Sequence, residues 1–295
     1  MIAWAEDNKT SRFKIMLTSI WNEFIYGGHL LAVGLSCVVT LSAILLNIAI
    51  SIEFLLVIYL LALGPCLFGR YVNLKNDALT NPDRSSYLNK RAKSMPLMIS
   101  FCVVTVIAIL VYNNKLDTLI FGVGIIIMSF FYDLFLKGLT KKVVGFKNIF
   151  VGFLFSSLVV MLVMYYGKSF GISFYLVYIF LFLMTAMGAA FSDIKDINGD
   201  KKEGLKTLAI VLGQKKLIKI LIFIILIALV PLAVGVYYNQ LPTYALMLVL
   251  VLPYNIFLFK ESLNKNTNTD FLYAVLFDSQ LILWLVLVLI GRVLV

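Results

Sequence analysis

Residues 216–237 read KLIKILIFIILIALVPLAVGVY, and beyond Lys219 this stretch contains no charged side chain. A helix needs about 20 predominantly apolar residues to cross the hydrocarbon core of a bilayer. The stretch therefore predicts a transmembrane helix. The whole chain has the same character, because 62% of its 295 residues are hydrophobic and 14% are charged, whereas soluble domains are about half apolar and about a quarter charged. This composition indicates a polytopic membrane protein and excludes an ordinary soluble one.

Nine apolar stretches of this kind occur along the chain. They lie at about 24–46, 54–72, 95–113, 118–136, 147–166, 171–192, 216–237, 241–259 and 271–291. They predict an all-α transmembrane bundle of nine helices around a central cavity open to the membrane. Little of the chain is left for a soluble domain, so we expect a single domain over residues 1–295. We also expect two repeated four-helix halves, about 24–136 and 147–259, and a ninth helix at 271–291.

The basic residues predict how these helices are oriented. When the loops are assigned alternately to two sides, only Lys115, Lys168 and Arg292 of the 25 Lys and Arg residues fall on one side. Since loops that stay in the cytoplasm are enriched in Lys and Arg, we expect a protein of the cytoplasmic (inner) membrane with the N-terminus and the aspartate-rich loops in the cytoplasm and the C-terminus outside. Lys9 and Arg12 precede the first apolar stretch and no small-residue cleavage site follows it, so no cleaved signal peptide is expected.

Acidic residues crowd the same side, which the positive-inside rule does not require. They follow the predicted second, fourth and sixth helices, where basic residues are also frequent. In a soluble chain the net charge of +10 could indicate nucleic acid, but in this membrane protein we expect no nucleic-acid partner. The mixture of charges predicts a site for a polyanion that is held partly through metal ions.

The most informative polar segment, residues 191–213, reads FSDIKDINGDKKEGLKTLAIVLG. Asp193, Asp196 and Asp200 are spaced i, i+3 and i+7, which places them on one face of a helix. Three carboxylates repel one another unless a cation lies among them, and Mg²⁺ typically binds one or two carboxylates together with waters and substrate phosphates. The spacing therefore suits a metal-bridged diphosphate. The alternative is a solvated acidic helix end paired with the neighbouring lysines.

A second polar segment, residues 70–84, reads RYVNLKNDALTNPDR. Asn73, Asp77 and Asn81 are four residues apart and would share a helical face, and Pro82 would then break the helix. The alternative is an amide-rich helix cap followed by an Asn-Pro turn. Segment 70–84 follows the predicted helix 2, and segment 191–213 follows the predicted helix 6. Because the two segments hold corresponding places in the two expected halves, we expect their polar faces to meet across one cavity.

Four other positions carry groups that could act chemically. Lys137 could reach a phosphate and Tyr132 could donate a hydrogen bond, although both residue types also anchor helices at membrane boundaries. His29 is expected to pack or lie at the interface rather than act as a base. Asp278 is an ionisable group within a predicted span, and such groups are either functional or hydrogen-bonded to a neighbouring helix.

With these motifs the chain resembles the UbiA superfamily of intramembrane prenyltransferases over nearly its full length. Members have nine helices, aspartate-rich motifs after helices 2 and 6, and a Tyr-Lys element after helix 4. The second motif is the specific one: D-x-x-D-x-x-x-D, then G-x-x-T-L and a terminal L-G, runs here from Asp193 to Gly213. The first motif departs from the family pattern, because Asn73 is followed by Leu rather than Asp, and Asn81 stands where Asp is usual, with Asp83 two residues later.

The resemblance implies Mg²⁺-dependent transfer of a prenyl group from an isoprenyl diphosphate, with release of pyrophosphate. It implies that the acceptor is an aromatic, quinone-precursor-like molecule or a lipid. The protein would also contact the surrounding membrane lipids. The residues then expected to hold Mg²⁺ are Asn73, Asp77, Asn81, Asp193, Asp196 and Asp200. The expected diphosphate ligands are Asn73, Arg84, Lys90, Arg91 and Lys137, and Tyr132 is expected beside the carbocation.

Two other functions compete with this one. Superfamily members with altered first motifs act as terpene cyclases, which close the cation onto its own chain, so the changed first motif keeps a cyclase open. A transporter is the second alternative. It would gather polar groups near the bilayer midplane around interrupted helices, whereas the polar groups here gather at helix ends, which argues against it.

Overall fold

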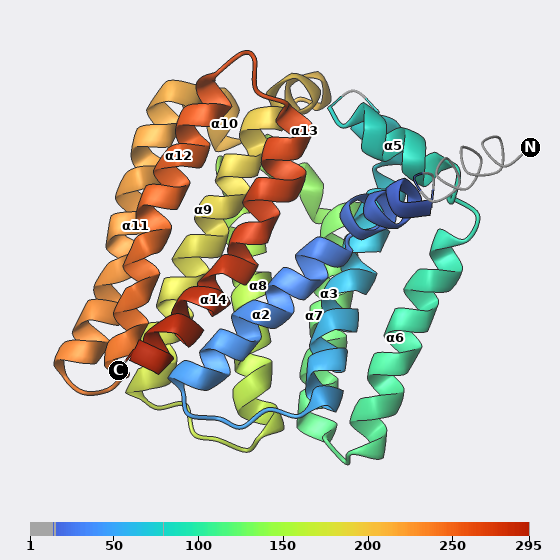
Figure 1. Cartoon of the computed structure of the whole chain (residues 1–295). Helices are drawn as coiled ribbons and strands as arrows, with labels where there is room; N and C mark the ends of the chain where they lie inside the picture. Colours follow the sequence, from blue (N-terminus) through green and yellow to red (C-terminus); the bar gives the residue numbers. More distant parts are fainter. Residues whose placement is uncertain (1–13, 15, 79, 295) are drawn as a thin grey trace, which may run out of the picture.

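The computed structural model describes residue 14, residues 16–78 and residues 80–294, and in Figure 1 they form an all-helical bundle. Among these residues, eight helices are long and apolar enough to cross a membrane, and a bent pair near the N-terminus raises this number to nine. The predicted all-α membrane fold is therefore confirmed.

Two expectations are not tested by this structure. Lys9 and Arg12, on which the expected lack of a cleaved signal peptide rests, lie outside the described residues. The division into two repeated halves stays a prediction.

The helices have these bounds, in chain order. They are Met16–Tyr26, α2 (His29–Leu45), α3 (Ile52–Val72), α4 (Leu74–Asp77), α5 (Pro82–Asn89), α6 (Met95–Tyr112), α7 (Leu116–Leu134), η1 (Leu136–Lys141), α8 (Phe146–Tyr165), α9 (Ile172–Glu203), α10 (Leu208–Leu212), α11 (Gln214–Tyr237), η2 (Thr243–Leu250), α12 (Val251–Leu263), α13 (Thr269–Phe271), η3 (Leu272–Phe277) and α14 (Asp278–Leu294).

The first span, expected as a helix at about 24–46, is a bent pair of helices. Helix Met16–Tyr26 meets α2 at an angle of 55°. At the bend, Gly28 has a φ of 91°, which residues with a side chain rarely adopt. A Cβ atom on Gly28 would also lie 2.9 Å from the sulfur of Cys66 in α3. Gly28 therefore allows both the change of direction and the close approach of α3.

The segment between α3 and α5 also differs from the prediction. The helix expected through Asn73, Asp77 and Asn81 is interrupted, because Asn73 ends α3 and Asn81 precedes α5. Pro82 begins α5 instead of breaking a helix. Proline fits the first turn of a helix, where its missing N–H group would have no intrahelical partner.

Helix α9 positions the specific polar segment. Its 32 residues span about 48 Å at a rise of about 1.5 Å per residue, whereas the hydrocarbon core is about 30 Å thick. The helix therefore continues past the apolar stretch predicted at 171–192 and carries the three aspartates beyond it. Gly204, with a φ of 72°, ends the helix in the left-handed conformation that is common at helix C-termini.

The last two spans contain irregular turns. The eighth begins as the 3₁₀ helix η2 and continues as α12. The ninth contains the π-helical segment η3 between α13 and α14. π-Helical turns are rare and often lie at functional sites. Here Tyr273 and Asp278, which lie in and directly after η3, both line the cavity described below.

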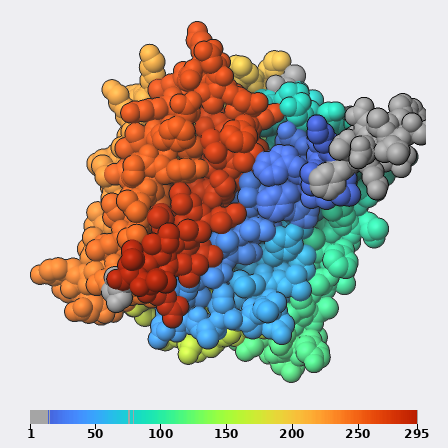
Figure 2. All heavy atoms as spheres, viewed as in Figure 1, coloured from blue at the N-terminus to red at the C-terminus, as the bar shows by residue number. Residues whose placement is uncertain are grey.

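The bundle is closed by contact between its first and last spans. Helix α14 packs along α2, and the red and blue segments lie side by side in Figures 1 and 2. Aromatic side chains fill the interior, where Phe180 packs against Trp284 and Phe191 against Phe259. Large apolar side chains such as Phe101 remain exposed on the outer helices, as expected of a surface that faces lipid.

The loops gather at two ends of the bundle. Helices α5, α10 and α13 lie at one end, and the C-terminus lies towards the other (Figure 1). The end with α5 carries most of the basic and acidic loop residues. Which end faces the cytoplasm stays a prediction.

Candidate active site

A cavity of about 430 Å³ lies among α2, α3, α7, α8, α9 and the η3–α14 segment. Its lining is divided. Charged and amide groups, including Asp77, Lys137 and Asp196, gather towards the end that carries α5. Apolar walls, including Leu61 and Leu158, extend further between the helices. A molecule with a charged head and an apolar tail would match this division.

Asp193, the first aspartate of α9, is fully buried. Its Oδ1 atom lies 2.5 Å from Lys147 Nζ, and its Oδ2 atom accepts a hydrogen bond of 2.8 Å from the Asn148 side chain. Asp193 is not among the cavity-lining residues, whereas Lys147 is. A buried carboxylate is stable when it is paired and hydrogen-bonded in this way. Asp193 is therefore paired with an ammonium group that lines the cavity.

Asp196 and Asp200 do line the cavity. Asp196 accepts a hydrogen bond of 3.4 Å from Asn81, so the two polar segments meet as their spacing predicts. Asp200 is 8% exposed, and its Oδ2 atom has no hydrogen-bond partner among the described residues. A buried, unsatisfied carboxylate oxygen is costly, and a bound cation would satisfy it. Two carboxylates beside a space for phosphate also match the usual donor set of Mg²⁺.

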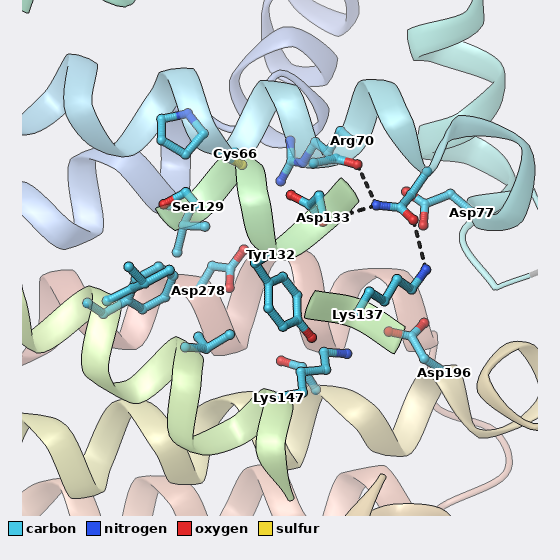
Figure 3. A pocket seen from close by; sticks show the side chains of 18 of the residues that line it. Cys66, Arg70, Asp77, Ser129, Tyr132, Asp133, Lys137, Lys147, Asp196 and Asp278 are labelled. Carbon is cyan, nitrogen blue, oxygen red and sulfur yellow. Dashed lines mark hydrogen bonds between the residues drawn. The ribbon is translucent and has the colours of Figure 1, made fainter. Parts of the chain in front are cut away.

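The three residues of the first motif each contact a cationic side chain. Lys137 donates to Asn73 at 2.8 Å, Arg84 pairs with Asp77 at 2.7 Å, and Lys195 donates to Asn81 at 3.0 Å. Figure 3 shows Asp77 and Lys137 on the same side of the cavity. Asp83 is exposed and does not line the cavity, so it does not take the place of Asn81.

The last turn of α7 and the following η1 bring Tyr132 and Lys137, respectively, to the same cavity. The Tyr132 ring stacks on Phe150 with ring centroids 4.8 Å apart. Lys137 also forms an ion pair of 2.8 Å with Glu203 at the end of α9. Asp133 accepts a hydrogen bond of 3.3 Å from Asn73 and thereby links α7 to the end of α3.

Two predicted diphosphate ligands lie elsewhere. Lys90 is exposed, and neither Lys90 nor Arg91 lines the cavity. Arg91 forms an ion pair with Glu23, which also accepts a hydrogen bond of 2.6 Å from Tyr87. A separate pocket at the bend of the first span is lined by Glu23, Arg91 and His29, whose ring lies 3.3 Å from Glu23. The structure therefore does not bring Lys90 and Arg91 to the other candidate ligands.

Tyr87 secures the contact between α5 and the first span. Burial and the hydrogen bond to Glu23 raise the pKa of Tyr87 to about 12. The phenol therefore remains protonated at neutral pH and donates to the carboxylate. This contact holds α5 against the first span.

Sequence reasoning assigned no role in the cavity to Arg70, Lys147 or Lys195, although all three line it. Arg70 donates a hydrogen bond of 2.6 Å to the carbonyl oxygen of Tyr26, at the bend. Lys195 could have been noticed, because it interrupts the aspartates of the specific motif. Arg70 and Lys147 have no such signal, since each depends on a bend or a contact between distant segments.

Asp278 is a further carboxylate of the cavity, on the side of Cys66 and Ser129 and away from Asp77 and Lys137 (Figure 3). Within the described part of the chain, its carboxylate forms neither a hydrogen bond nor an ion pair with another side chain. The sequence left packing and function open for this residue. Its place on the cavity wall favours function.

A polar pocket that continues into an apolar one, within an all-helical membrane bundle, indicates a membrane protein that binds a lipid with a charged head. Comparison with known families gives the particular family. A model of the UbiA prenyltransferase family matches residues 30–277. The chain belongs to this family and is a prenyltransferase of the membrane-embedded UbiA type.

Individual relatives agree with this assignment. The chain is 26% identical over 199 residues to digeranylgeranylglyceryl phosphate synthase of Thermococcus sibiricus, which covers 63% of this chain and 68% of the relative. The apo structure of a UbiA homologue from Aeropyrum pernix K1 superposes with a TM-score of 0.68 at 15% identity, covering 90% of this chain and 97% of that one. A UbiA homologue from Archaeoglobus fulgidus bound to GPP and Mg²⁺ gives a TM-score of 0.64 at 15% identity, covering 90% and 98%.

Proposed function

We propose that this protein transfers a prenyl group from an isoprenyl diphosphate to an aromatic or lipid acceptor in a magnesium-dependent reaction. The carbon–oxygen bond of the donor breaks, and both electrons leave with the pyrophosphate. The allylic carbon then bonds to a nucleophilic atom of the acceptor, which loses a proton. The observation that carries this proposal is the cavity itself, in which Asp196 and Asp200 face cationic side chains and apolar walls extend beyond them.

The pyrophosphate leaving group gains negative charge as the bond breaks, and the protein must stabilise this charge. Magnesium would be held by Asp196 and Asp200 and would neutralise charge on the phosphates as the bond breaks. Arg84, Lys137 and Lys195 line the same end of the cavity and would donate charge-assisted hydrogen bonds to phosphate oxygens. Of the predicted metal ligands, this assignment retains Asp196 and Asp200. It gives Asp193 a positioning role through Lys147.

The prenyl tail would occupy the apolar part of the cavity. Leu61, Ile125 and Leu158 line it and offer no nucleophile that could capture a carbocation. The face of Tyr132, held by stacking on Phe150, would stabilise the developing positive charge. The GPP and Mg²⁺ bound by the Archaeoglobus homologue support a donor of this kind.

The acceptor would approach from the side of Asp278 and Ser129. Asp278 has no side-chain partner among the described residues and could accept the proton that the acceptor loses. The synthase relative makes a glyceryl phosphate lipid by name, which supports a lipid hydroxyl as acceptor. An aromatic acceptor remains the other candidate.

Pyrophosphate release tests this function. We expect purified protein to release pyrophosphate from geranylgeranyl diphosphate when Mg²⁺ and a suitable acceptor are both present, and to stop when EDTA removes the metal. Acceptors to compare are 4-hydroxybenzoate, a glyceryl phosphate and a prenylated glyceryl phosphate. Release that needs no acceptor and yields a cyclised hydrocarbon would show the terpene cyclase instead. Undiminished release in EDTA would contradict the proposed magnesium site.

We also propose that the protein lies in the cytoplasmic membrane with the end carrying α5 in the cytoplasm. The excess of basic residues in the loops at this end supports the proposal. Alkaline phosphatase fused to the C-terminus should then be active, because it folds only outside the cytoplasm, and a fluorescent protein fused there should be dark. The opposite result with both reporters would reverse the orientation.

A further inference from the structure

The first motif, defined here as Asn73, Asp77 and Asn81, is poorly suited to a metal ion. Two of its three side chains are neutral amides, and the oxygen of each amide already accepts a hydrogen bond from a lysine. The one carboxylate, Asp77, is paired with Arg84 at 2.7 Å. Mg²⁺ requires near-octahedral oxygen ligands and usually at least one free carboxylate. The first motif offers cations where a metal site would offer free oxygens.

The acidic residues around the first motif also provide few ligands for a metal ion. Over residue 14, residues 16–78 and residues 80–294, no group of three or more His, Cys, Asp or Glu side chains is arranged to hold a metal ion. Four cavity-lining carboxylates form no ion pair with a described residue, namely Asp133, Asp196, Asp200 and Asp278. Of these four, Asp196 and Asp200 lie one turn apart on the same helix, α9. Together with phosphate oxygens and water they suffice for a single Mg²⁺ ion.

Lys195 is held in place between the two motifs by three elements. On α9 it directly precedes Asp196, and its ammonium donates to Asn81 at the start of α5. From η3, the ring of Tyr273 lies 5.7 Å from the same ammonium, within the range of a cation–π contact. Gly199 allows α9 to come close to the segment before α5, since a Cβ atom at Gly199 would lie 2.7 Å from the Thr80 methyl group.

We propose that the Lys195 ammonium takes the place of a metal ion at the first motif. The donor diphosphate would then be bound by one magnesium ion, on Asp196 and Asp200, and by Lys195 together with Arg84. An ammonium is a compact cation with three donors that can be shared between a protein oxygen and a phosphate. The inference rests on the proposed function, because the diphosphate is the proposed donor.

Counting bound Mn²⁺ tests the inference without turnover. Mn²⁺ replaces Mg²⁺ at oxygen sites and is counted by electron paramagnetic resonance and by equilibrium dialysis. The probe is geranylgeranyl thiodiphosphate, in which sulfur replaces the oxygen between the allylic carbon and the phosphorus atom. This replacement slows ionisation. We expect one Mn²⁺ per chain with the probe in the wild type, and one in Lys201→Ala, which changes an exposed lysine of the same helix.

Restoring a carboxylate and removing the lysine should create a second site. The double variant Lys195→Ala/Asn81→Asp is expected to bind two Mn²⁺ ions per chain. Asn81→Asp alone should still bind one, because Lys195 would pair with the new carboxylate. Two ions in the wild type, or one in the folded double variant, would overturn the role of Lys195 and leave the proposed function intact. No probe-dependent Mn²⁺ in the wild type would overturn the proposed function as well.

Discussion

Asp196→Asn is expected to lower pyrophosphate release by about 10²–10³-fold, the usual loss when one group that stabilises transition-state charge is removed. The carboxylate lines the cavity and meets the first motif through Asn81. Asparagine keeps its shape and removes the charge that would hold Mg²⁺. Turnover is measured on purified protein with saturating donor and acceptor, and the unfolding midpoint in detergent is measured alongside.

The matched control is Asp117→Asn, which changes an exposed aspartate in the first turn of α7, away from the cavity. It should retain full turnover. The unfolding midpoint of Asp196→Asn should stay close to that of the wild type, because Asp196 forms no ion pair with a described residue. Full turnover in Asp196→Asn would contradict the assignment of the metal to this carboxylate.

Lys147→Met is expected to destabilise the protein by about 3–5 kcal/mol, the usual cost of breaking a buried ion pair by removing one partner. Asp193 is 0% exposed, and Lys147 lies 2.5 Å from it. Methionine nearly preserves the volume of the lysine side chain but leaves the carboxylate with only Asn148 as a partner. The unfolding free energy is measured by denaturant titration in detergent.

Two further variants separate this effect from a general loss of charge. Lys142→Met changes an exposed lysine of the same region and should leave the unfolding free energy unchanged. The double variant Lys147→Met/Asp193→Leu should recover much of the lost stability, because well-packed apolar residues can replace a buried pair. An unchanged unfolding free energy in Lys147→Met would refute the structural role of the pair.

The spans and the specific motif could be predicted because they depend on local sequence. Apolar length alone locates the membrane helices, and the i, i+3, i+7 spacing holds because α9 continues through Asp200. The prediction that the two polar segments meet also holds, since Asn81 contacts Asp196. The bend at Gly28 was missed, although two adjacent glycines are a signal that a helix can end.

The division of labour among the aspartates could not be predicted. Spacing treats Asp193 and Asp196 alike, and only the packing of α8 against α9 directs one to Lys147 and the other to the cavity. The same limit applies to Arg91, whose partner Glu23 lies 68 residues earlier in the chain. Contacts between distant segments depend on the tertiary arrangement, which a single sequence does not encode in its local pattern.

The mass of the product tests the central claim most directly. Purified protein is incubated with geranylgeranyl diphosphate, Mg²⁺ and the prenylated glyceryl phosphate or 4-hydroxybenzoate, and the lipids are extracted and weighed by mass spectrometry. We expect an acceptor that has gained one geranylgeranyl group in place of a hydrogen atom, with one pyrophosphate released per product, and about 10²–10³-fold slower formation of both in Asp196→Asn. A geranylgeranyl hydrocarbon or alcohol as the only product, with every acceptor unchanged, would contradict it.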